Sequence, residues 1–110
     1  MTGVQTCALP ISIVDYNKIQ LDGFVKDILD LEPLASKWAS FGWHVIEVDG
    51  HDVAALQRAF AEASATKGKP SCVLAHTVKG KGVSFMENNP KYHGSAPSRD
   101  ELSKALQELA

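Results

Sequence analysis

The sequence has 110 residues, of which 45% are hydrophobic and 22% charged, and its formal net charge at pH 7 is -2. This composition is typical of one globular domain or a part of one, and it lacks the basic field of nucleic-acid-binding proteins. No apolar run approaches the roughly 20 residues of a membrane span. We expect a soluble protein, and cysteines without metal or redox spacing favour a reduced, cytoplasmic setting.

The opening segment MTGVQTCALPIS follows neither the period of a strand nor that of a helix. It also lacks the basic start of a secretory signal. It resembles the translation of a sequencing adapter joined to a truncated reading frame. We therefore interpret residues 1–11 as a non-native leader and residues 12–110 as the evolved sequence. The alternative is a disordered natural N-terminus.

After this segment, short apolar runs alternate with amphipathic stretches, a pattern that predicts βαβ units and a parallel sheet. The predicted strands are ISIVDY (11–16), WHVIEV (43–48) and SCVLAH (71–76). The last is almost continuously apolar, as expected of a strand buried on both faces. The predicted fold class is therefore α/β with a parallel sheet.

Three helices are predicted from start and stop signals. The first begins near Pro33 and ends at Gly42, the second begins after the cap Asp52 and ends before Gly68 and Pro70, and the third opens with the capping box of Ser98 and Glu101. Their predicted inward faces are Leu34, Trp38 and Phe41 in the first, Val53, Leu56, Phe60 and Ala63 in the second, and Leu102, Leu106 and Leu109 in the third.

Between the last strand and the last helix lies a long segment without clear period, TVKGKGVSFMENNPKYHGSAP. Structureless loops of this length are usually functional or disordered. Phe85, Met86 and Tyr92 argue against disorder, because such side chains need a surface to pack on. We expect an ordered active-site loop.

Asn17 follows the first strand, at the sheet edge where α/β proteins collect ligands. Its side-chain oxygen and the backbone carbonyl of Ile19 are hard neutral ligands of the kind that Mg²⁺ or Ca²⁺ accepts. The alternative is an ordinary Asx turn, in which Asn17 binds its own backbone. Residue type alone favours the Asx turn.

The segments DYNKIQLDG, DGHD, TVKGKG and YHGSAP resemble transketolases in their order and spacing. The resemblance covers residues 12–110 and implies a thiamine diphosphate-binding domain. In that family an Asn followed by Lys-Ile closes a metal motif that begins upstream with Gly-Asp-Gly. The resemblance thus implies Asn17 and the Ile19 carbonyl as ligands of Mg²⁺ or Ca²⁺. Nothing upstream of Ile13 resembles Gly-Asp-Gly, so we expect a domain truncated at its N-terminus.

His93 in KYHGSAP matches the family histidine beside the cofactor diphosphate and the donor sugar. The resemblance implies a catalytic and cofactor-binding role, which suits a group that donates hydrogen bonds and exchanges protons near neutral pH. Lys79 and Lys81 in KGKG are compatible with a phosphate cradle or with a solvated loop, and His76 at the end of the last strand with a ligand contact or with none.

The implied reaction is the transfer of a two-carbon ketol unit from a ketose phosphate to an aldose phosphate. The implied partners are a separate C-terminal transketolase subunit with the pyrimidine-binding domain, further copies of the assembled enzyme, and sugar phosphates. Because the family's activating glutamate is absent here, we expect this chain alone to be inactive. The sugars and the metal stay open.

Two alternatives remain. A 1-deoxyxylulose-5-phosphate synthase fragment would also carry KGKG and YHG loops, but its metal segment reads differently from YNKIQLDG. A non-catalytic α/β binding module would be a stable monomer with a closed core, whereas a truncated enzyme would expose an apolar sheet face or edge.

Overall fold

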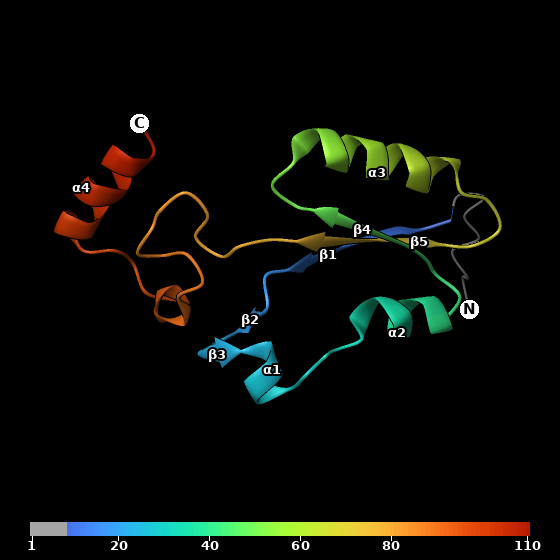
Figure 1. Cartoon of the computed structure of the whole chain (residues 1–110), viewed down its shortest axis with the longest axis horizontal. Coiled ribbons are helices and arrows are strands. Elements are labelled where there is room, and N and C mark those ends of the chain that lie inside the picture. Colours follow the sequence, from blue (N-terminus) through green and yellow to red (C-terminus); the bar gives the residue numbers. More distant parts are fainter. Residues whose placement is uncertain (1–8) are drawn as a thin grey trace, which may run out of the picture. The chain divides into compact units, whose positions relative to one another are not determined.

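The computed structural model describes residues 9–110, which divide into two compact units. We call the first the sheet unit; its described part comprises residues 9–15 and 33–76. We call the second the loop unit; it comprises residues 16–32 and 77–110. Most of the predicted leader lies outside the described residues, and the leader interpretation stays a prediction. Figure 1 labels the elements along the chain.

The sheet unit is built on three strands in the order β1-β5-β4. Their bounds are Ile11–Tyr16 for β1, whose last residue belongs to the loop unit, His44–Asp49 for β4 and Ser71–His76 for β5. Strands β4 and β5 pair in parallel, from His44 opposite Ser71 to Asp49 opposite His76. Strands β1 and β5 are also parallel. The Ser71 N–H donates to the Pro10 carbonyl at one end of β1 and the Thr77 N–H donates to the Tyr16 carbonyl at the other, so the two chain segments advance in the same direction. The predicted α/β fold with a parallel sheet is confirmed.

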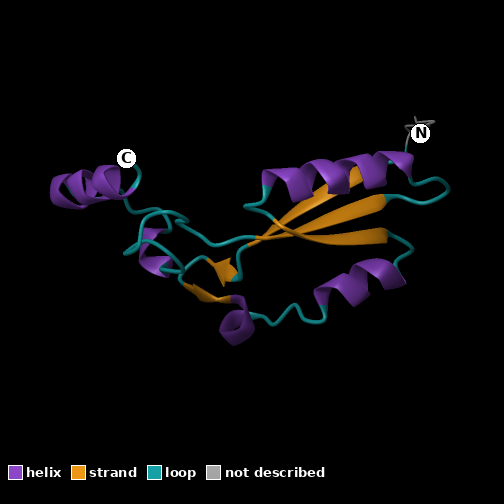
Figure 2. Ribbon diagram, turned by 45° about the horizontal axis from the view of Figure 1, so that its top comes forward, coloured by secondary structure: helices purple, strands orange, loops and turns teal. Residues whose placement is uncertain are grey.

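Two helices cover opposite faces of this sheet, α2 (Leu34–Ser40) and α3 (Val53–Ala65) (Figures 1 and 2). The predicted cap of α3 is confirmed, because the Asp52 Oδ1 accepts the Ala55 N–H at 2.9 Å. Helix α2 ends where Gly42 takes a positive φ of 86°, as predicted for its stop signal. Helix α3 connects the parallel neighbours β4 and β5, so this part is a βαβ unit.

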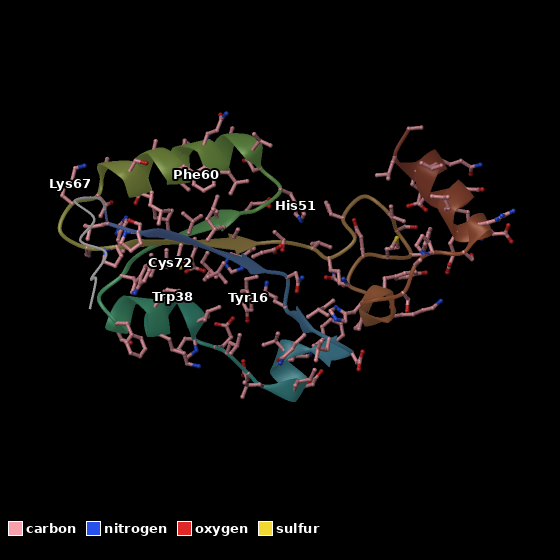
Figure 3. The ribbon with its side chains drawn as sticks, turned by 180° about the vertical axis from the view of Figure 1, so that it is seen from behind. Tyr16, Trp38, His51, Phe60, Lys67 and Cys72 are labelled. Carbon is pink, nitrogen blue, oxygen red and sulfur yellow. The ribbon has the colours of Figure 1, made fainter. Side chains whose placement is uncertain are left out.

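The core of the sheet unit lies between α3 and the central strand. Ala59, Ala63 and Val73 form its buried cluster, with Ile46 and Val48 packed against it. Residues 72–75 of β5 are all buried, which confirms the strand predicted to be covered on both faces. Figure 3 labels Cys72 in this strand. Its thiol is free, and burial raises the pKa of Cys72.

The predicted inward face of α3 is wrong in two places. Val53 is 69% exposed and Phe60 38% exposed, whereas Ala59 and Ala63 are buried. Leu56 is half-buried and Ala63 buried, as predicted, so the observed face overlaps the predicted one and is displaced from it by only part of one residue's rotation of about 100°. Alanine lets the helix approach the sheet closely, which leaves the larger apolar side chains outside. On α2, Phe41 is likewise exposed, against the prediction.

The loop unit contains short elements. They are the antiparallel pair β2 (Ile19–Gln20) and β3 (Gly23–Phe24), the helical turn α1 (Val25–Ile28), the 3₁₀ turn η1 (Pro90–Tyr92) and the helix α4 (Arg99–Glu108). Between residues 78 and 93 the backbone forms hydrogen-bonded turns around the buried Val83, whose N–H donates to the Gly80 carbonyl at 3.1 Å. These turns agree with the expected order of this part of the loop, and its active-site role stays a prediction.

Helix α4 starts as predicted. The Ser98 Oγ accepts the Glu101 N–H at 3.3 Å, and the Glu101 carboxylate accepts the Ser98 N–H at 2.7 Å. Its predicted apolar face does not form a core, because Leu102, Leu106 and Leu109 are 48–61% exposed and Ala105 is the buried residue. The physical reason is that the strands of the loop unit, β2 and β3, have two residues each and are too short to form a sheet face that would bury this helix.

Among residues 9–110, none of the helices combines the length and apolar character that crossing a membrane requires.

Candidate functional site

The turn after β1 fixes the side chain of Asn17. Its Oδ1 accepts the Ile19 N–H at 2.9 Å, which is the Asx turn considered as the alternative to a metal site. Lys18 between them has a positive φ of 63°, a conformation that costs a non-glycine residue roughly 1–2 kcal/mol. The Asx turn is compatible with metal binding by Asn17, because its side-chain oxygen has two lone pairs and the turn occupies only one of them.

The carbonyl of Ile19 points to the same side as its N–H. The Val25 N–H donates to the Lys18 carbonyl at 2.9 Å, and Ile19 lies opposite Phe24. Hydrogen-bonded and non-hydrogen-bonded pairs alternate in antiparallel strands, so the Ile19 and Phe24 pair is the non-hydrogen-bonded kind. The backbone groups of Ile19 therefore turn away from β3. Asn17 Oδ1 and the Ile19 carbonyl thus lie near each other at the end of β1.

Beside this turn the loop unit has a cavity of about 380 Å³. Tyr16, Lys18 and Phe24 line it from one segment, and Asn88 lines it from the long loop. Tyr16 at the strand end and Asn88 of the long loop therefore meet at one cavity within the loop unit, whereas Asn17, Ile19 and His93 are not among its lining residues.

Tyr16 closes the segment 16–32 through a hydrogen bond between its two ends. No sequence signal singled this residue out. Its buried hydroxyl donates to Glu32 Oε1 at 2.8 Å, joining the first and last residues of the 16–32 segment. Burial, and then the bond to Glu32 and its charge, raise the pKa of Tyr16 to about 12. Tyr16 therefore remains a neutral hydrogen-bond donor at physiological pH.

His93 directly follows the turn η1 and is exposed. Its N–H donates to the Pro90 carbonyl at 2.8 Å, and within the described residues its imidazole makes no hydrogen bond or ion pair. The structure therefore brings Asn17 and Ile19 together and leaves the His93 imidazole available to a ligand.

The KGKG segment is not an open phosphate cradle. Glu87 Oε1 accepts the Gly82 N–H at 3.0 Å and lies 3.8 Å from the Lys81 ammonium. The Lys79 carbonyl accepts the Asn88 N–H at 2.9 Å. A carboxylate of the chain itself thus occupies the place that a phosphate would take.

His76 is also paired, because its Nε2 lies 2.8 Å from Glu47 Oε2.

No group of three or more His, Cys, Asp or Glu side chains able to hold a metal ion exists among residues 9–110. A metal at Asn17 and Ile19 would therefore need further ligands from a bound anion and from residues outside this stretch.

The whole chain, residues 1–110, matches the family model described as transketolase, thiamine diphosphate binding domain. A 6-deoxy-6-sulfo-D-fructose transketolase subunit SqwG of a Clostridium species is 42% identical over 99 residues, covering 90% of this chain and 36% of that protein. One subunit of the apulose-4-phosphate transketolase of Actinobacillus succinogenes is 46% identical over 99 residues, covering 90% of this chain and 36% of that protein. The chain thus spans about a third of the length of these relatives.

The fold of the chain also resembles that of a solved transketolase. The crystal structure of transketolase from Campylobacter jejuni aligns with a TM-score of 0.79 and 28% identity, over 90% of this chain and 15% of that one. A family model that covers the entire chain agrees with this structural match and with the relatives above. The chain therefore belongs to the transketolase family, in which it represents thiamine diphosphate-binding domain sequence.

Proposed function

We propose that this chain is part of a transketolase that moves a two-carbon ketol unit from a ketose phosphate to an aldose phosphate. In this proposal Asn17 Oδ1 and the Ile19 carbonyl bind Mg²⁺ or Ca²⁺, and His93 contacts the cofactor diphosphate and the sugar. The observation that carries it is the turn after β1, in which Asn17 Oδ1 accepts the Ile19 N–H at 2.9 Å and the Ile19 carbonyl turns away from β3.

The donor set suits a metal that anchors a diphosphate. Amide and peptide oxygens are neutral hard ligands, so the metal keeps charge with which to bind the phosphate oxygens. A site made of this chain's carboxylates alone is not available among the described residues. The missing carboxylate ligand would come from the upstream Gly-Asp-Gly segment that the family pattern implies.

When bound, thiamine diphosphate supplies the electron sink for cleaving a carbon–carbon bond next to a carbonyl. His93 would hold the oxyanions near it, because an exposed imidazole on a short turn can donate hydrogen bonds and exchange protons near neutral pH. Gly94 has a positive φ of 76°, and a Cβ added to it would meet nothing within 4 Å, so a ligand could approach the backbone there.

The relatives' names support a partner chain. SqwG and the apulose-4-phosphate protein are both described as transketolase subunits. We propose that this chain acts with a second subunit carrying the pyrimidine-binding domain, and that the assembled enzyme forms higher oligomers. Their names also widen the substrate class, because one is named for a sulfonated sugar and the other for a sugar phosphate. The substrate proposed here is accordingly a ketose with an anionic end.

The test is ketol transfer by the full-length enzyme that contains this chain, assembled with its proposed second subunit. Fructose 6-phosphate, 6-deoxy-6-sulfofructose and apulose 4-phosphate serve as donors with one aldose phosphate acceptor. We expect transfer that depends on thiamine diphosphate and a divalent metal, and a loss of at least about 100-fold in kcat/KM in His93→Ala.

Gln20→Ala is the matched control, because Gln20 is exposed and lies beside the turn without being placed in the site. It should keep the wild-type rate. Activity without added thiamine diphosphate and metal, or wild-type activity in His93→Ala, would contradict the proposal.

A further inference from the structure

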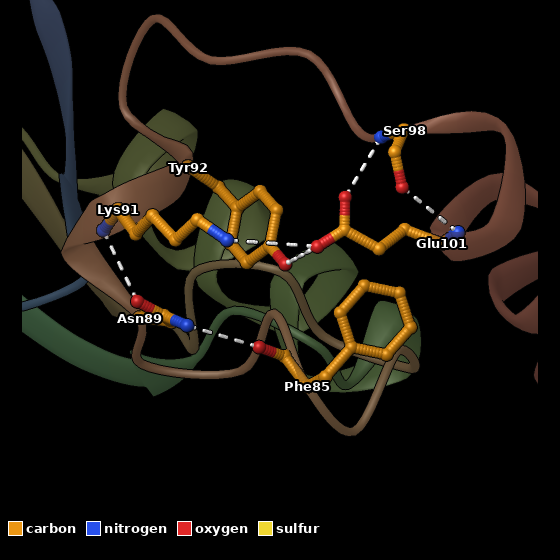
Figure 4. A network of polar contacts seen from close by, with 6 residues as sticks. All are labelled: Phe85, Asn89, Lys91, Tyr92, Ser98 and Glu101. Carbon is orange, nitrogen blue, oxygen red and sulfur yellow. Dashed lines mark hydrogen bonds and ion pairs between the residues drawn. The ribbon is translucent and has the colours of Figure 1, made fainter.

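A single carboxylate, that of Glu101, joins the turn η1 to the start of α4 (Figure 4). Glu101 Oε1 accepts the Tyr92 hydroxyl at 2.8 Å, and Oε2 accepts the Ser98 N–H at 2.7 Å. The Lys91 ammonium lies 3.6 Å from Oε1. One side chain thus binds three donors from two elements.

The two short bonds enclose the segment 93–97. Tyr92 precedes His93 and Ser98 follows Pro97, so the carboxylate ties both ends of the loop. Every residue of that loop is exposed. The His93 N–H donates to the Pro90 carbonyl, which belongs to η1 and lies only three residues earlier in the chain. Since none of the residues 93–97 is buried, the position of the loop depends on its ends.

The Tyr92 end is itself well fixed. The Asn89 Oδ1 accepts the Lys91 N–H at 3.1 Å, and its Nδ2 donates to the Phe85 carbonyl at 3.1 Å. The rings of Phe85 and Tyr92 lie 6.0 Å apart in a tilted arrangement. The turn η1 is therefore a rigid support, and the Tyr92 hydroxyl couples it to Glu101.

The Glu101 carboxylate is ionised at neutral pH. The Ser98 backbone N–H, then the Tyr92 hydroxyl and the Ser98 side chain, lower its pKa to about 2. Bonds to an ionised acceptor are shorter and stronger than neutral ones, which fits the 2.7 and 2.8 Å distances.

We propose that Glu101 is a positioning residue that fixes both ends of the 93–97 loop and thereby sets where His93 meets its ligand. This inference rests on the proposed function, in which His93 contacts the cofactor diphosphate and the sugar. It goes beyond the capping box, which by itself concerns helix α4 alone.

Tyr92→Phe is the discriminating variant, because it removes one hydroxyl and leaves the ring contact with Phe85 and the capping box intact. Ser98→Ala is its matched control. It removes the Oγ that accepts the Glu101 N–H at 3.3 Å, so it weakens the helix cap, but both bonds to the Glu101 carboxylate remain. Glu101→Ala removes the helix cap and the bond to Tyr92 together.

Each variant is examined in the full-length, assembled enzyme by three measurements. They are the hydrogen-exchange rate of the Gly94 to Ala96 amides, the NMR line of the His93 Cε1–H, and the separate values of kcat and KM. In Tyr92→Phe we expect exchange at least about tenfold faster, a changed His93 line, and kcat lower by about 10- to 100-fold at a similar global melting temperature. In Ser98→Ala we expect a lower melting temperature and kcat within about twofold of wild type.

The inference is overturned if Tyr92→Phe matches wild type in exchange and kcat, or if Ser98→Ala loses as much kcat as Tyr92→Phe. It is also overturned if exchange rises in Tyr92→Phe while kcat stays unchanged and His93→Ala is inactive. Failure of the proposed function has a different signature: His93→Ala would keep wild-type kcat, while the exchange and NMR changes of Tyr92→Phe would still report on the loop.

Discussion

The two units of this chain are stabilised by different interactions. The sheet unit has a continuous apolar centre, in which Val73 and Leu74 are at most 1% exposed. In the loop unit the apolar residues are scattered, and carboxylates hold the turns. Glu32 binds Tyr16, Glu87 binds the Gly82 N–H, Glu101 binds Tyr92, and Glu108 binds Ser84.

This difference bears on where the proposed ligand-binding residues lie. Parallel strands between two helices are a scaffold whose position is set by burial. The candidate ligands Asn17 and Ile19 and the histidine His93 all belong to the loop unit, which has little core of its own. Segments of that kind carry function because few contacts fix them, so each polar tie matters.

The largest effect should follow from damage to the sheet core. Leu74→Ala removes a fully buried side chain from the central strand and should cost about 2–5 kcal/mol of unfolding free energy. Leu106→Ala, at a side chain that is 60% exposed, is the control and should cost well under about 1 kcal/mol. Urea denaturation of the full-length protein measures both. Equal losses would mean that α4 is covered in the assembled protein.

The next effect concerns two glycines with similar backbone angles. Gly80 and Gly42 have φ of 74° and 86°, but a Cβ on Gly80 would lie 2.6 Å from the Met86 carbonyl oxygen, whereas nothing lies within 4 Å at Gly42. Gly42→Ala should cost only the conformational strain of about 1–2 kcal/mol. Gly80→Ala should cost more and speed hydrogen exchange in residues 79–88. A smaller loss for Gly80→Ala than for Gly42→Ala would show that the turn relaxes easily.

Removing the hydroxyl that closes the 16–32 segment should have a moderate effect. Tyr16→Phe leaves the buried ring and deletes the bond to Glu32, at a cost of about 1–3 kcal/mol. Amide exchange should rise in residues 17–25 and stay unchanged in β4. In wild type, spectrophotometric titration should find Tyr16 ionising near pH 12, above the ordinary tyrosine value of 10. A normal titration would exclude the buried bond to Glu32.

Acid should loosen the loop unit before the sheet unit, and this is the smallest effect. The pKa of Glu101 is lowered from 4.5 to about 2, and bonds from Ser84 also lower the pKa of Glu108. A lowered carboxyl pKa contributes stability above the ordinary value, and that stability is lost as the pH falls from about 4.5 towards 2. Exchange in residues 84–101 should therefore rise over that range while β5 stays protected. Loss of exchange protection in residues 84–101 and in β5 at the same pH would contradict the prediction that acid destabilises the loop unit first.

The sequence predicted what depends on local pattern. The apolar runs gave the three strands, and Asp52 and the Ser98 and Glu101 pair gave two helix starts, because these signals lie within a few residues of the structure they determine. The face of α3 was wrong because hydrophobicity alone ranks Phe60 above Ala59, while close packing on the sheet selects the smaller residue.

The ties within the loop unit could not be predicted from the sequence. Tyr16 and Glu32 are distant in the chain, and their bond depends on the path of the intervening hairpin. Glu101 was recognised as half of a capping box, but its second oxygen and the Tyr92 hydroxyl meet only in three dimensions. Asn17 and Ile19 were identified through the family resemblance, since an Asx turn gives the same local sequence signal.

The most direct test of the proposed metal site is calorimetric binding of thiamine diphosphate to the full-length, assembled protein with and without Mg²⁺. We expect metal-dependent binding, a loss of affinity of at least about tenfold in Asn17→Ala, and wild-type affinity in Gln20→Ala. Asn17→Asp, which keeps an oxygen ligand, should recover part of the affinity. Equal metal-dependent affinity in wild type and Asn17→Ala would show that Asn17 only forms a turn, and the assignment of the metal site would be wrong.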